Sequence, residues 1–375
     1  MLKILIFGVT PAQGGIETFV LNVCKVTQGL AKVYLYNFSD SEVAYQNTFK
    51  KKYGVNIFNI ITKRNIIGHM TRKFQYKNFF KHHKFDIVHI NANSPSNYDF
   101  AQEALRSGAK VIYHSHNDSS ESFVLNKKAK KIINIVRAYQ RFRLNRLSIS
   151  RVAVSQDAAK WMFGKKENVS IVPNGVDFSK FEFSNIKREQ RRMLLNIDLN
   201  DIVLLTASRL TKQKNFNRIL TVANLALTKG SVDHVVIIGD GDQMSMIQQF
   251  RSALPADVKS RIHIMGAQND MQSWYSLADL LLMPSLYEGL PYSILEAQAN
   301  GLNCFISTAI PKQAVINSKL MHFHSKEDTD LLWINDIEKH KKQNINRDLA
   351  YKKANQSPYS LTKFKLAIEN LYNLK

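Results

Sequence analysis

Two carboxylates stand eight positions apart in the stretch LYEGLPYSILEAQANG, residues 286–301 of this 375-residue chain. Glu288 falls in a Gly-Leu-Pro turn, and Glu296 falls in the helical pattern that follows it. A carboxylate accepts hydrogen bonds from hydroxyls, often two on each oxygen. In one interpretation the acids cap a helix and add solubility. In the other, they hold the hydroxyls of a sugar nucleotide whose phosphates lie at the same helix end.

Two cations follow an apolar run in the stretch ASRLTKQKN, residues 207–215. Arg209 and Lys214 come directly after an expected strand and lie around the start of the next helix. Two cations at the carboxyl end of a strand are well placed to bind a diphosphate. They would also offset the repulsion between the two acids and a phosphate. Ordinary surface charge is the alternative interpretation.

A glycine pair, Gly14 and Gly15, separates the first apolar run from a helical pattern in GVTPAQGGIETFVLNV, residues 8–23. Glycine lets the backbone approach a ligand closely, and the amides at a helix start attract anions. The stretch lacks the G-x-G-x-x-G dinucleotide fingerprint, and no G-K-[ST] follows as in a P-loop. A ligand loop and a plain turn therefore both fit.

The chain alternates apolar, β-branched runs with helical patterns, and this rhythm restarts after about residue 175. The expected strands are 3–7, 32–36, 56–61, 86–90, 110–114 and 151–154, then 202–207, 234–238, 261–264, 280–283 and 303–306. In the first half, helices are expected to begin near Gly15, Ile66, Ser96 and Ser119. Continuous apolar strands between helices predict parallel sheets covered on both faces. We therefore expect an α/β protein of two Rossmann-like, doubly wound domains that face a central cleft.

The expected boundaries divide the chain into 1–174, 175–357 and 358–375. The last segment is expected to be a helix that crosses back to the first domain. The turn at 284–290 should follow the strand 280–283, with Pro291 in the first helical turn and Gly301 at the helix stop. Cys24 and Cys304 lie far apart in apolar contexts, which favours buried free thiols and a cytoplasmic protein.

The net charge of +22 comes from 52 basic and 30 acidic residues. Much of the excess lies in two acid-free blocks, between Glu42 and Asp86 and after Glu121, where basic residues alternate with apolar ones at helical spacing. The apolar stripes are Ile67, Met70 and Phe74 in the first block, and Ile132, Ile135, Val136 and Tyr139 in the second. Solvated helix faces over a core, or attraction to an anionic membrane surface, would explain the pattern. No nucleic-acid-binding motif accompanies the charge, so nucleic acid is not an expected partner.

Six motifs occur together in the order typical of one family. They are GGIE at 14–17, HSHND at 114–118, VPNGVD at 172–177, SRLTKQKN at 208–215, IGDGD at 238–242 and E-x7-E at 288–296. The combination resembles the retaining, nucleotide-sugar-dependent glycosyltransferases of family 4 (group 1), which have the GT-B architecture. It is most similar to the branch that makes bacterial capsules and exopolysaccharides.

The resemblance implies roles for positions in the first half. Gly14 and Gly15 would line the donor phosphate and the acceptor side. His116 matches a histidine after the fifth strand that approaches the transferred sugar, although a strand-end histidine that caps the sheet, or confusion with His114, is the alternative. Asn174 would lie in the hinge loop that faces the cleft.

The resemblance also implies how the second half binds the donor. Arg209 and Lys214 would bind the diphosphate. Glu288 would hold sugar hydroxyls, assisted by the backbone amides of Gly289 and Leu290. With His116, these charged groups form the implied catalytic set. No Asp-x-Asp metal site is evident, so positive charge would replace a metal in stabilising the leaving diphosphate. No cofactor is therefore expected.

By the same resemblance, Glu296 would hold the ribose hydroxyls, and the base would rest near Gly266–Asn269. Two stretches depart from the family pattern: GLNCFIS at 301–307 replaces the commoner Gly-x-Pro-Val, and TAIPKQAVIN at 308–317 replaces Gly-Gly-x-x-Glu. The second departure leaves the sugar preference open.

The implied activity is transfer of a hexose or N-acetylhexosamine from a nucleotide sugar, most simply a UDP-sugar, with retention of configuration. The acceptor would be a hydroxyl of a polyprenyl-diphosphate-linked sugar or an oligosaccharide. The enzyme would lie on the cytoplasmic face of the plasma membrane through its basic helices. The alternatives are an enzyme like the sugar-nucleotide 2-epimerases on the same architecture, or an inactive scaffold of a polysaccharide assembly complex.

Overall fold

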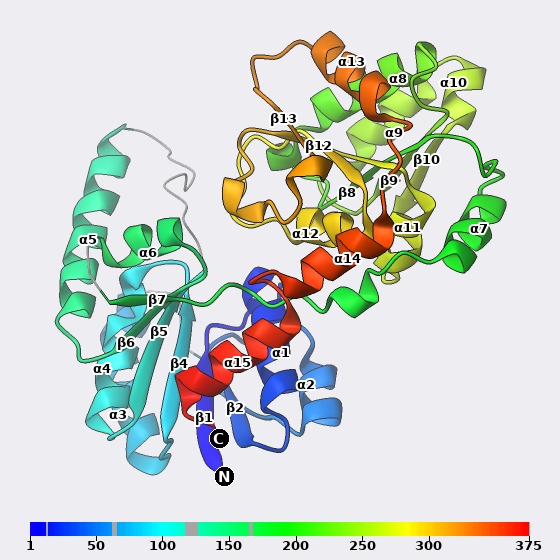
Figure 1. Ribbon diagram of the computed structural model, residues 1–375. Helices are drawn as coiled ribbons and strands as arrows, with labels where there is room; N and C mark the ends of the chain where they lie inside the picture. The colour runs from blue at the N-terminus through cyan, green and yellow to red at the C-terminus, as the bar shows by residue number, and fades with distance from the viewer. Residues whose placement is uncertain (13, 62–65, 117–126, 165–167, 375) are drawn as a thin grey trace. The chain divides into compact units, whose positions relative to one another are not determined.

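The computed structural model describes residues 1–12, 14–61, 66–116, 127–164 and 168–374, with only the backbone described for 66–70 and 127–130. The chain forms two units, Met1–Gly175 with Leu361–Lys375, and Val176–Ser360. Each unit is a parallel sheet with helices on both faces (Figure 1). The predicted α/β class with two doubly wound domains is therefore confirmed. Whether the two domains face one cleft stays a prediction.

The first unit holds a seven-stranded sheet of order β3-β2-β1-β4-β5-β6-β7. Its strands are β1 (Leu2–Phe7), β2 (Ala31–Asn37), β3 (Asn56–Asn59), β4 (Ile87–Ala92), β5 (Lys110–Ser115), β6 (Ser150–Ala153) and β7 (Val169–Ile171). Its helices are α1 (Gly15–Thr27), α2 (Gln46–Tyr53), α3 (Ile66–His82), α4 (Tyr98–Arg106), α5 (Lys127–Asn145), α6 (Gln156–Phe163) and α15 (Leu361–Tyr372), with a 3-10 turn at Pro95–Asn97.

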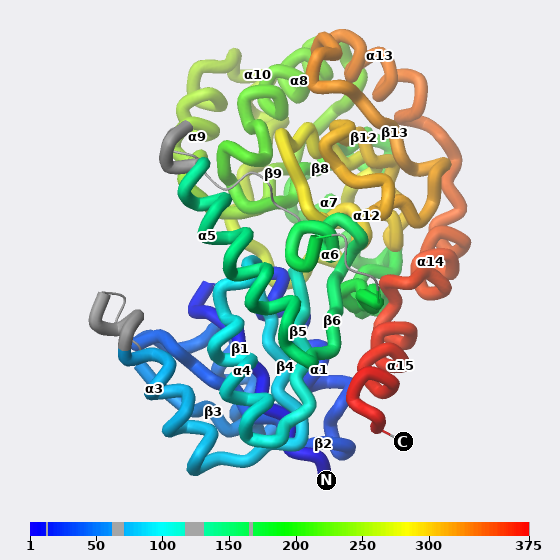
Figure 2. Tube along the Cα trace, turned by 90° about the vertical axis from the view of Figure 1, so that its left-hand side faces the viewer, coloured from blue at the N-terminus to red at the C-terminus, as the bar shows by residue number. Residues whose placement is uncertain are grey.

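Two apolar layers enclose this sheet. Helices α1, α2 and α15 cover one face, and α3, α4 and the end of α5 cover the other (Figure 1). Figure 2 turns the side with α3, α4 and α5 toward the viewer. Alternate residues of β1 separate accordingly, because successive side chains of a strand point to opposite faces: Ile4 and Ile6 join the first layer, and Leu5 and Phe7 join the second. The helix α15 lies beside α1 (Figure 1) and buries Ile368 in the same layer.

The second unit holds a six-stranded sheet of order β10-β9-β8-β11-β12-β13. Its strands are β8 (Val203–Ala207), β9 (His234–Ile238), β10 (Ile262–Gly266), β11 (Leu280–Met283), β12 (Asn303–Ser307) and β13 (Met321–His324). Its helices are α7 (Asn185–Leu194), α8 (Phe216–Thr228), α9 (Met244–Ser252), α10 (Ala256–Ser260), α11 (Met271–Leu277), α12 (Tyr292–Asn300), α13 (Asp330–His340) and α14 (Arg347–Gln356). Short 3-10 turns occupy Phe178–Lys180, Lys212–Lys214, Lys312–Ala314 and Ser318–Leu320.

Every expected strand is present, with its ends moved by a few residues, but β7 and β13 were not predicted. Of the expected helix starts, Gly15 and Ile66 are confirmed, and α4 begins at Tyr98 after its 3-10 turn. The start expected near Ser119 lies outside the described residues. Both cysteines are buried free thiols, as predicted. In the part of the chain that the structure describes, no helix is long and apolar enough to cross a membrane.

Candidate active site

Each sheet has a point where the strand order reverses. In the first sheet this point lies between β1 and β4, and in the second it lies between β8 and β11. In doubly wound sheets, ligands bind beyond the carboxyl ends of the strands at this point. Gly14 and Gly15 follow β1, Arg209 and Lys214 follow β8, and Glu288 follows β11. The predicted residues therefore lie on the loops that the topology favours for a ligand.

Lys214 and Glu288 meet across the reversal point of the second sheet. Their charged groups form an ion pair at 2.6 Å, and the side chains are only 13% and 6% exposed. The two loops are joined along the backbone as well, because the Leu286 N–H donates to the Gln213 carbonyl at 2.8 Å. The Asn215 amide adds a bond to the Pro284 carbonyl at 3.2 Å. A cation and an acid are thus held together where a charged ligand is expected.

The loop that carries Arg209 rests on the Gly-Asp-Gly turn after β9. A Cβ at Gly239 (φ +136°) would lie 1.8 Å from the Ser208 carbonyl oxygen, and one at Gly241 (φ +156°) would lie 2.4 Å from that of Leu210. Only glycine adopts such backbone angles without strain and leaves this space free. Arg209 itself is exposed. The two glycines of the IGDGD motif therefore let the turn after β9 pack closely against the β8–α8 loop.

The glycine turn also connects this loop to the predicted base site. The Gly239 N–H donates to the Gly266 carbonyl at the end of β10, at 2.9 Å. A Cβ at Gly266 (φ +67°) would meet no described atom within 4 Å, so its backbone faces open space. In the strand order, β10 lies two strands from β8, so Gly266 ends its strand at the same edge of the sheet as the Arg209 loop.

Helix α12 begins and ends as the sequence predicts. Pro291 precedes its first residue, and Gly301 ends it in the left-handed conformation at φ +83°. Gly289 is exposed and Leu290 is half-buried in the turn before the helix. The free amides of a helix start attract negative charge. This helix start lies immediately after Glu288.

Glu296 lies in the second turn of α12 and contacts Tyr275 of α11. The Tyr275 hydroxyl donates to its Oε2 at 2.9 Å. Burial raises the pKa of the Glu296 carboxyl to about 7, and the tyrosine bond only partly opposes this effect. Glu296 is thus on the same helix as the Glu288 turn, but its described contact is Tyr275 rather than Lys214.

In the first unit, Gly14 caps α1 and Gly15 is its first residue. Glu17, buried in the first turn, accepts hydrogen bonds from the Thr10 N–H at 2.9 Å and from the Thr10 hydroxyl at 2.8 Å. These bonds close the loop between β1 and α1. Sequence reasoning quoted Glu17 in the GGIE motif but gave it no role, although an acid three residues after a helix cap is a recognisable pattern.

The structure separates His116 from His114. His116 follows β5, and its Nε2–H donates to Asn91 Oδ1 at 2.8 Å. The amide of Asn91 is oriented by its own bond to the Phe7 carbonyl at 3.2 Å. His116 Nδ1 has no hydrogen-bond partner among the described residues, and burial lowers the pKa of this histidine to about 3. It is therefore a neutral ring with a free acceptor nitrogen at a strand end.

His114, in contrast, belongs to the core. It is fully buried on β5 and pairs with His89 of β4 at 3.2 Å between ring nitrogens. His89 in turn contacts the hydroxyl of Tyr372 on α15 at 2.6 Å. Burial holds the pKa of His114 well below its usual value. These contacts place His114 in the core, although its Nε2 has no hydrogen-bond partner among the described residues.

Asn174 lies at the end of the first unit, in the loop after β7. It is buried, and its Oδ1 has no hydrogen-bond partner among the described residues. Next to it, the Gly175 carbonyl accepts from the Asn22 amide at 2.6 Å, and a Cβ at Gly175 would lie 2.6 Å from the Phe364 ring. The glycine of the VPNGVD motif is therefore required by the packing of α15.

The structure thus brings Lys214 and Glu288 into contact and places Arg209, Gly266 and Glu296 on neighbouring elements of the same unit. The other predicted residues are Gly289 and Leu290, which follow Glu288 in the second unit, and Gly14, Gly15, His116 and Asn174 in the first unit. That both sets line one cleft stays a prediction.

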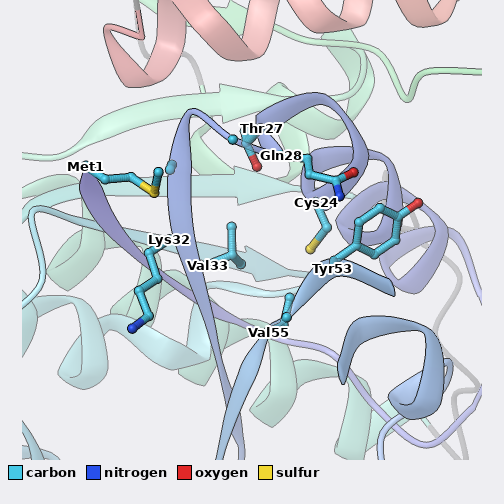
Figure 3. A pocket seen from close by; sticks show the side chains of 11 residues that line it. Met1, Cys24, Thr27, Gln28, Lys32, Val33, Tyr53 and Val55 are labelled. Atoms are coloured by element: carbon cyan, nitrogen blue, oxygen red, sulfur yellow. The ribbon is translucent and has the colours of Figure 1, made fainter. Parts of the chain in front are cut away.

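A cavity of about 220 Å³ in the first unit lies away from these residues (Figure 3). It is lined by the end of α1, the start of β2 and the end of α2, including Cys24, Lys32 and Tyr53. These positions are at the amino end of the sheet, opposite Gly15 and His116. Burial raises the pKa of the Cys24 thiol to about 12, so the thiol is not a reactive nucleophile.

Two proteins with glycosyltransferase names are similar to this chain in sequence. A protein from Escherichia coli, named UDP-Gal:alpha-D-GlcNAc-diphosphoundecaprenol alpha-1,3-galactosyltransferase, is 25% identical over 276 residues, which cover 73% of this chain and 69% of its own. The putative glycosyltransferase EpsF from Bacillus subtilis is 25% identical over 311 residues, covering 80% and 78%.

Solved structures share the fold. HepE from Anabaena, crystallised in complex with UDP-glucose, matches with a TM-score of 0.76 at 19% identity, and all of both chains is covered. WaaG, described as a glycosyltransferase of lipopolysaccharide biosynthesis, matches with a TM-score of 0.69 at 16% identity over 98% of this chain and 99% of its own. Together with the two doubly wound units, these likenesses show the GT-B fold.

Two family models match successive parts of the chain. The model described as Glycosyltransferase Family 4 matches residues 13–180, and the one described as Glycosyl transferases group 1 matches residues 201–332. The matched ranges together contain all eleven predicted site residues. The chain therefore belongs to the group 1, family 4 glycosyltransferases.

Proposed function

We propose that this glycosyltransferase moves a hexose or N-acetylhexosamine from a UDP-sugar to a hydroxyl of a polyprenyl-diphosphate-linked sugar. The Lys214–Glu288 pair at the reversal point of the second sheet carries the donor part of the proposal. The galactosyltransferase relative, whose name specifies UDP-galactose and an undecaprenyl-diphosphate-linked acceptor, supports the choice of both substrates. A role in capsule or exopolysaccharide synthesis belongs to the same proposal.

In this proposal the donor's diphosphate binds Arg209, Lys214 and the amides at the start of α12. Glu288 accepts hydrogen bonds from hydroxyls of the transferred sugar, and the backbone N–H groups of Gly289 and Leu290 donate to sugar oxygens. Because Glu288 already contacts Lys214, the sugar and phosphate contacts are adjacent, as the two parts of a nucleotide sugar require. The backbone at Gly266 is left for the base.

Glu296 is assigned to the ribose. Its pKa of about 7 reflects a carboxylate that burial deprives of solvent, with the Tyr275 hydroxyl as its described donor. Ribose hydroxyls would donate further hydrogen bonds to the ionised Glu296 carboxylate. These bonds would lower the pKa of the carboxyl and favour nucleotide binding. This contact would distinguish a nucleotide from a free sugar phosphate.

The transfer step that we propose needs no metal ion. The acceptor hydroxyl oxygen bonds to the anomeric carbon on the face that the diphosphate leaves, and the bond from that carbon to the phosphate oxygen breaks. The departing phosphate oxygen takes the hydroxyl proton, so the products are UDP and a glycoside of retained configuration. Arg209, Lys214 and the helix start stabilise the charge that develops on the leaving group. His116 Nδ1, an acceptor with no described partner, orients a hydroxyl of the transferred sugar.

Substitutions at the ion pair test the donor site. K214A and E288Q should each lower turnover by about 10²–10³-fold, the range seen when one group that stabilises a transition-state charge is removed. The matched control is the Lys341–Glu338 pair, which is of similar length at 2.8 Å but joins residues of one helical turn. K341A and E338Q should keep wild-type turnover. Wild-type rates in K214A and E288Q, with both proteins folded, would refute the donor site.

The same assay separates the finer parts of the proposal. Turnover should persist in EDTA, and an absolute requirement for magnesium would contradict the metal-free step. Conversion of a UDP-N-acetylhexosamine without any acceptor would instead indicate an epimerase. Comparison of the product's anomeric configuration with that of the donor, by NMR, tests retention.

We also propose that α5 docks on the anionic inner face of the plasma membrane. Six of its apolar side chains are between 45% and 63% exposed: Ile132, Ile133, Ile135, Val136, Tyr139 and Phe142. The helix has no acidic residue, and Lys131, Arg137 and Arg143 accompany the apolar side chains. Exposed apolar groups with basic neighbours are typical of a surface that enters a lipid headgroup layer. The predicted stripe of α3 is described only at Phe74, which is 73% exposed.

A further inference from the structure

A cluster of two histidines and an aspartate in the second unit lies outside the residues assigned to the donor. His322 is on the edge strand β13, and Asp336 and His340 are one turn apart on α13. One ligand atom of each lies within 4.8 Å of the others. The three side chains are 11%, 26% and 21% exposed, so an ion can reach them from solvent. Figure 1 shows β13 and α13, both orange, in the same part of the second unit.

The hydrogen bonds around His322 leave one of its nitrogens without a proton. The Asn303 amide donates to the His340 carbonyl at 3.3 Å, so its Oδ1 faces His322 and accepts from the Nε2–H at 3.3 Å. His322 Nδ1 then carries a lone pair, and it lies 3.7 Å from Asp336 Oδ2. Two electron-rich atoms that face each other without a proton repel, whereas a cation between them would attract both.

The carboxylate of Asp336 is also oriented from its other sides. His340 Nδ1 donates to the Asp336 carbonyl at 2.9 Å and lies 3.0 Å from Asp336 Oδ1, which leaves His340 Nε2 as an acceptor. His324 Nε2 contacts Asp336 Oδ2 at 3.0 Å. Neighbours that hold a ligand's orientation are regular features of metal sites. Asp328, which lies 3.4 Å from His324 Nδ1, completes this outer set.

We propose that His322, Asp336 and His340 bind a divalent transition-metal ion of the zinc type. Two imidazoles and one carboxylate suit zinc, whereas calcium and magnesium favour all-oxygen sites. A tetrahedral ion at about 2.0–2.1 Å from each ligand brings the ligand atoms to about 3.3 Å from one another. The side chains must therefore rotate inward from the separations of up to 4.8 Å that the structure shows.

The bound ion has a structural role. It ties the edge strand β13 to α13, in addition to the contacts of His322 and His324 with Asp336 and the ring contacts His322–His340 and His324–Trp333. The site does not take part in transfer, so this inference does not depend on the proposed function or on a metal-free transfer step. Loading should raise Tm without being required for turnover.

The experiment uses the full chain without a histidine tag, dialysed against EDTA and then against metal-free buffer. Titration calorimetry with zinc chloride at pH 7.5 should give one saturable site, and zinc should raise Tm. Cobalt chloride should give the strong visible absorption of a tetrahedral ion. H340Q and D336N should each weaken zinc binding at least about tenfold.

The matched control is H82Q on α3. His82 Nδ1 contacts the carbonyl four residues earlier, Asn78, at 2.9 Å, which is the same local contact that His340 makes with Asp336. H82Q should bind zinc as the wild type does. The proposal is overturned if saturable binding is absent, if both variants retain wild-type affinity, or if H82Q loses binding equally. If a variant does not fold, the cobalt spectrum of the wild type decides: tetrahedral bands support the site, and the spectrum of hydrated cobalt alone overturns it.

Discussion

At the scale of single residues, the ion pair between Lys214 and Glu288 shows how a donor site can be prepared before its ligand arrives. Each charge would be costly to bury alone, and pairing at 2.6 Å lets both remain nearly covered. The pair also fixes both side chains, so less conformational entropy is lost when a ligand binds. A diphosphate would then share the ammonium group with an acid that is already in place.

The buried histidines predict how stability depends on pH. Burial lowers the pKa values of His89 and His116 to about 3, below the ordinary value of 6.5. Between pH 6.5 and 3 the unfolded chain therefore binds protons that the folded chain excludes, so the free energy of unfolding falls as the pH falls. Each histidine contributes a slope of up to about 1.4 kcal/mol per pH unit. Glu296, with a raised pKa of about 7, contributes the opposite slope between about pH 7 and 4.5.

Urea unfolding at pH 7.5, 6.5, 5.5 and 4.5 measures this slope. H89Q should reduce it by the contribution of one histidine even if the variant is less stable at every pH. An unfolding free energy that stays flat or rises from pH 6.5 to 4.5 would contradict the buried, neutral rings. E296Q is the complementary variant and should make the slope steeper.

At the scale of elements, the glycine turn after β9 determines where the Arg209 loop lies. In G239A the new Cβ would begin 1.8 Å from the Ser208 carbonyl, so the turn or the loop must move. We expect a loss of about 2–4 kcal/mol of unfolding free energy, because both a clash and a strained φ are introduced. We also expect weaker donor binding.

G230A is the matched control in the same unit. Gly230 also has a positive φ, +69°, but a Cβ there would meet nothing within 4 Å. G230A should lower the free energy of unfolding by only about 1–2 kcal/mol, and the variant should keep wild-type affinity for the donor. Equal stability losses in both variants, with donor binding unchanged, would show that the Gly239 contact does not position the loop. Thermal unfolding and titration with UDP provide the two readouts.

Most elements could be predicted from the sequence because their apolar runs are continuous. The exceptions have physical reasons. β13 is an edge strand in which two of four residues, His322 and His324, are histidines that contact Asp336, so it lacks an apolar run. β7 has only three residues. Helix α2 buries only Phe49, which is too little to give a helical stripe.

The site was predictable in its loops but not in its contacts. The motifs identified the loops after β1, β5, β8 and β11. The Lys214–Glu288 contact spans 74 positions and depends on β8 lying next to β11, which no local pattern determines. Nor could the sequence distinguish His116 from His114, because both lie at the end of the same strand pattern and the packing around each side chain is not a local property.

At the scale of the whole molecule, the proposed membrane surface predicts lipid-dependent sedimentation. The protein should sediment with vesicles of phosphatidylglycerol and phosphatidylcholine at low ionic strength, and much less with phosphatidylcholine alone, because each Lys or Arg near the surface contributes about 1 kcal/mol. Salt should reverse the binding. The I132S/I135S double variant should sediment less, and it should fold because both side chains are more than 60% exposed.

The matched control for this experiment is L331S/L332S. These leucines are 50% and 51% exposed on α13 of the second unit, so their replacement removes similar apolar surface elsewhere. It should leave sedimentation unchanged. Equal binding to neutral and anionic vesicles, or no binding at low salt, would refute the membrane surface and leave the transferase assignment intact.

The return of α15 to the first unit has a consequence for biosynthesis. Phe364, Ile368 and Tyr372 complete the apolar layer beside α1, yet they are translated only after all of residues 176–360. A nascent chain can therefore finish its second half while its first half still lacks a helix. Domains usually fold in the order in which they emerge from the ribosome. In this protein the first domain is synthesised first, but it can complete its apolar layer only after the second domain has been synthesised.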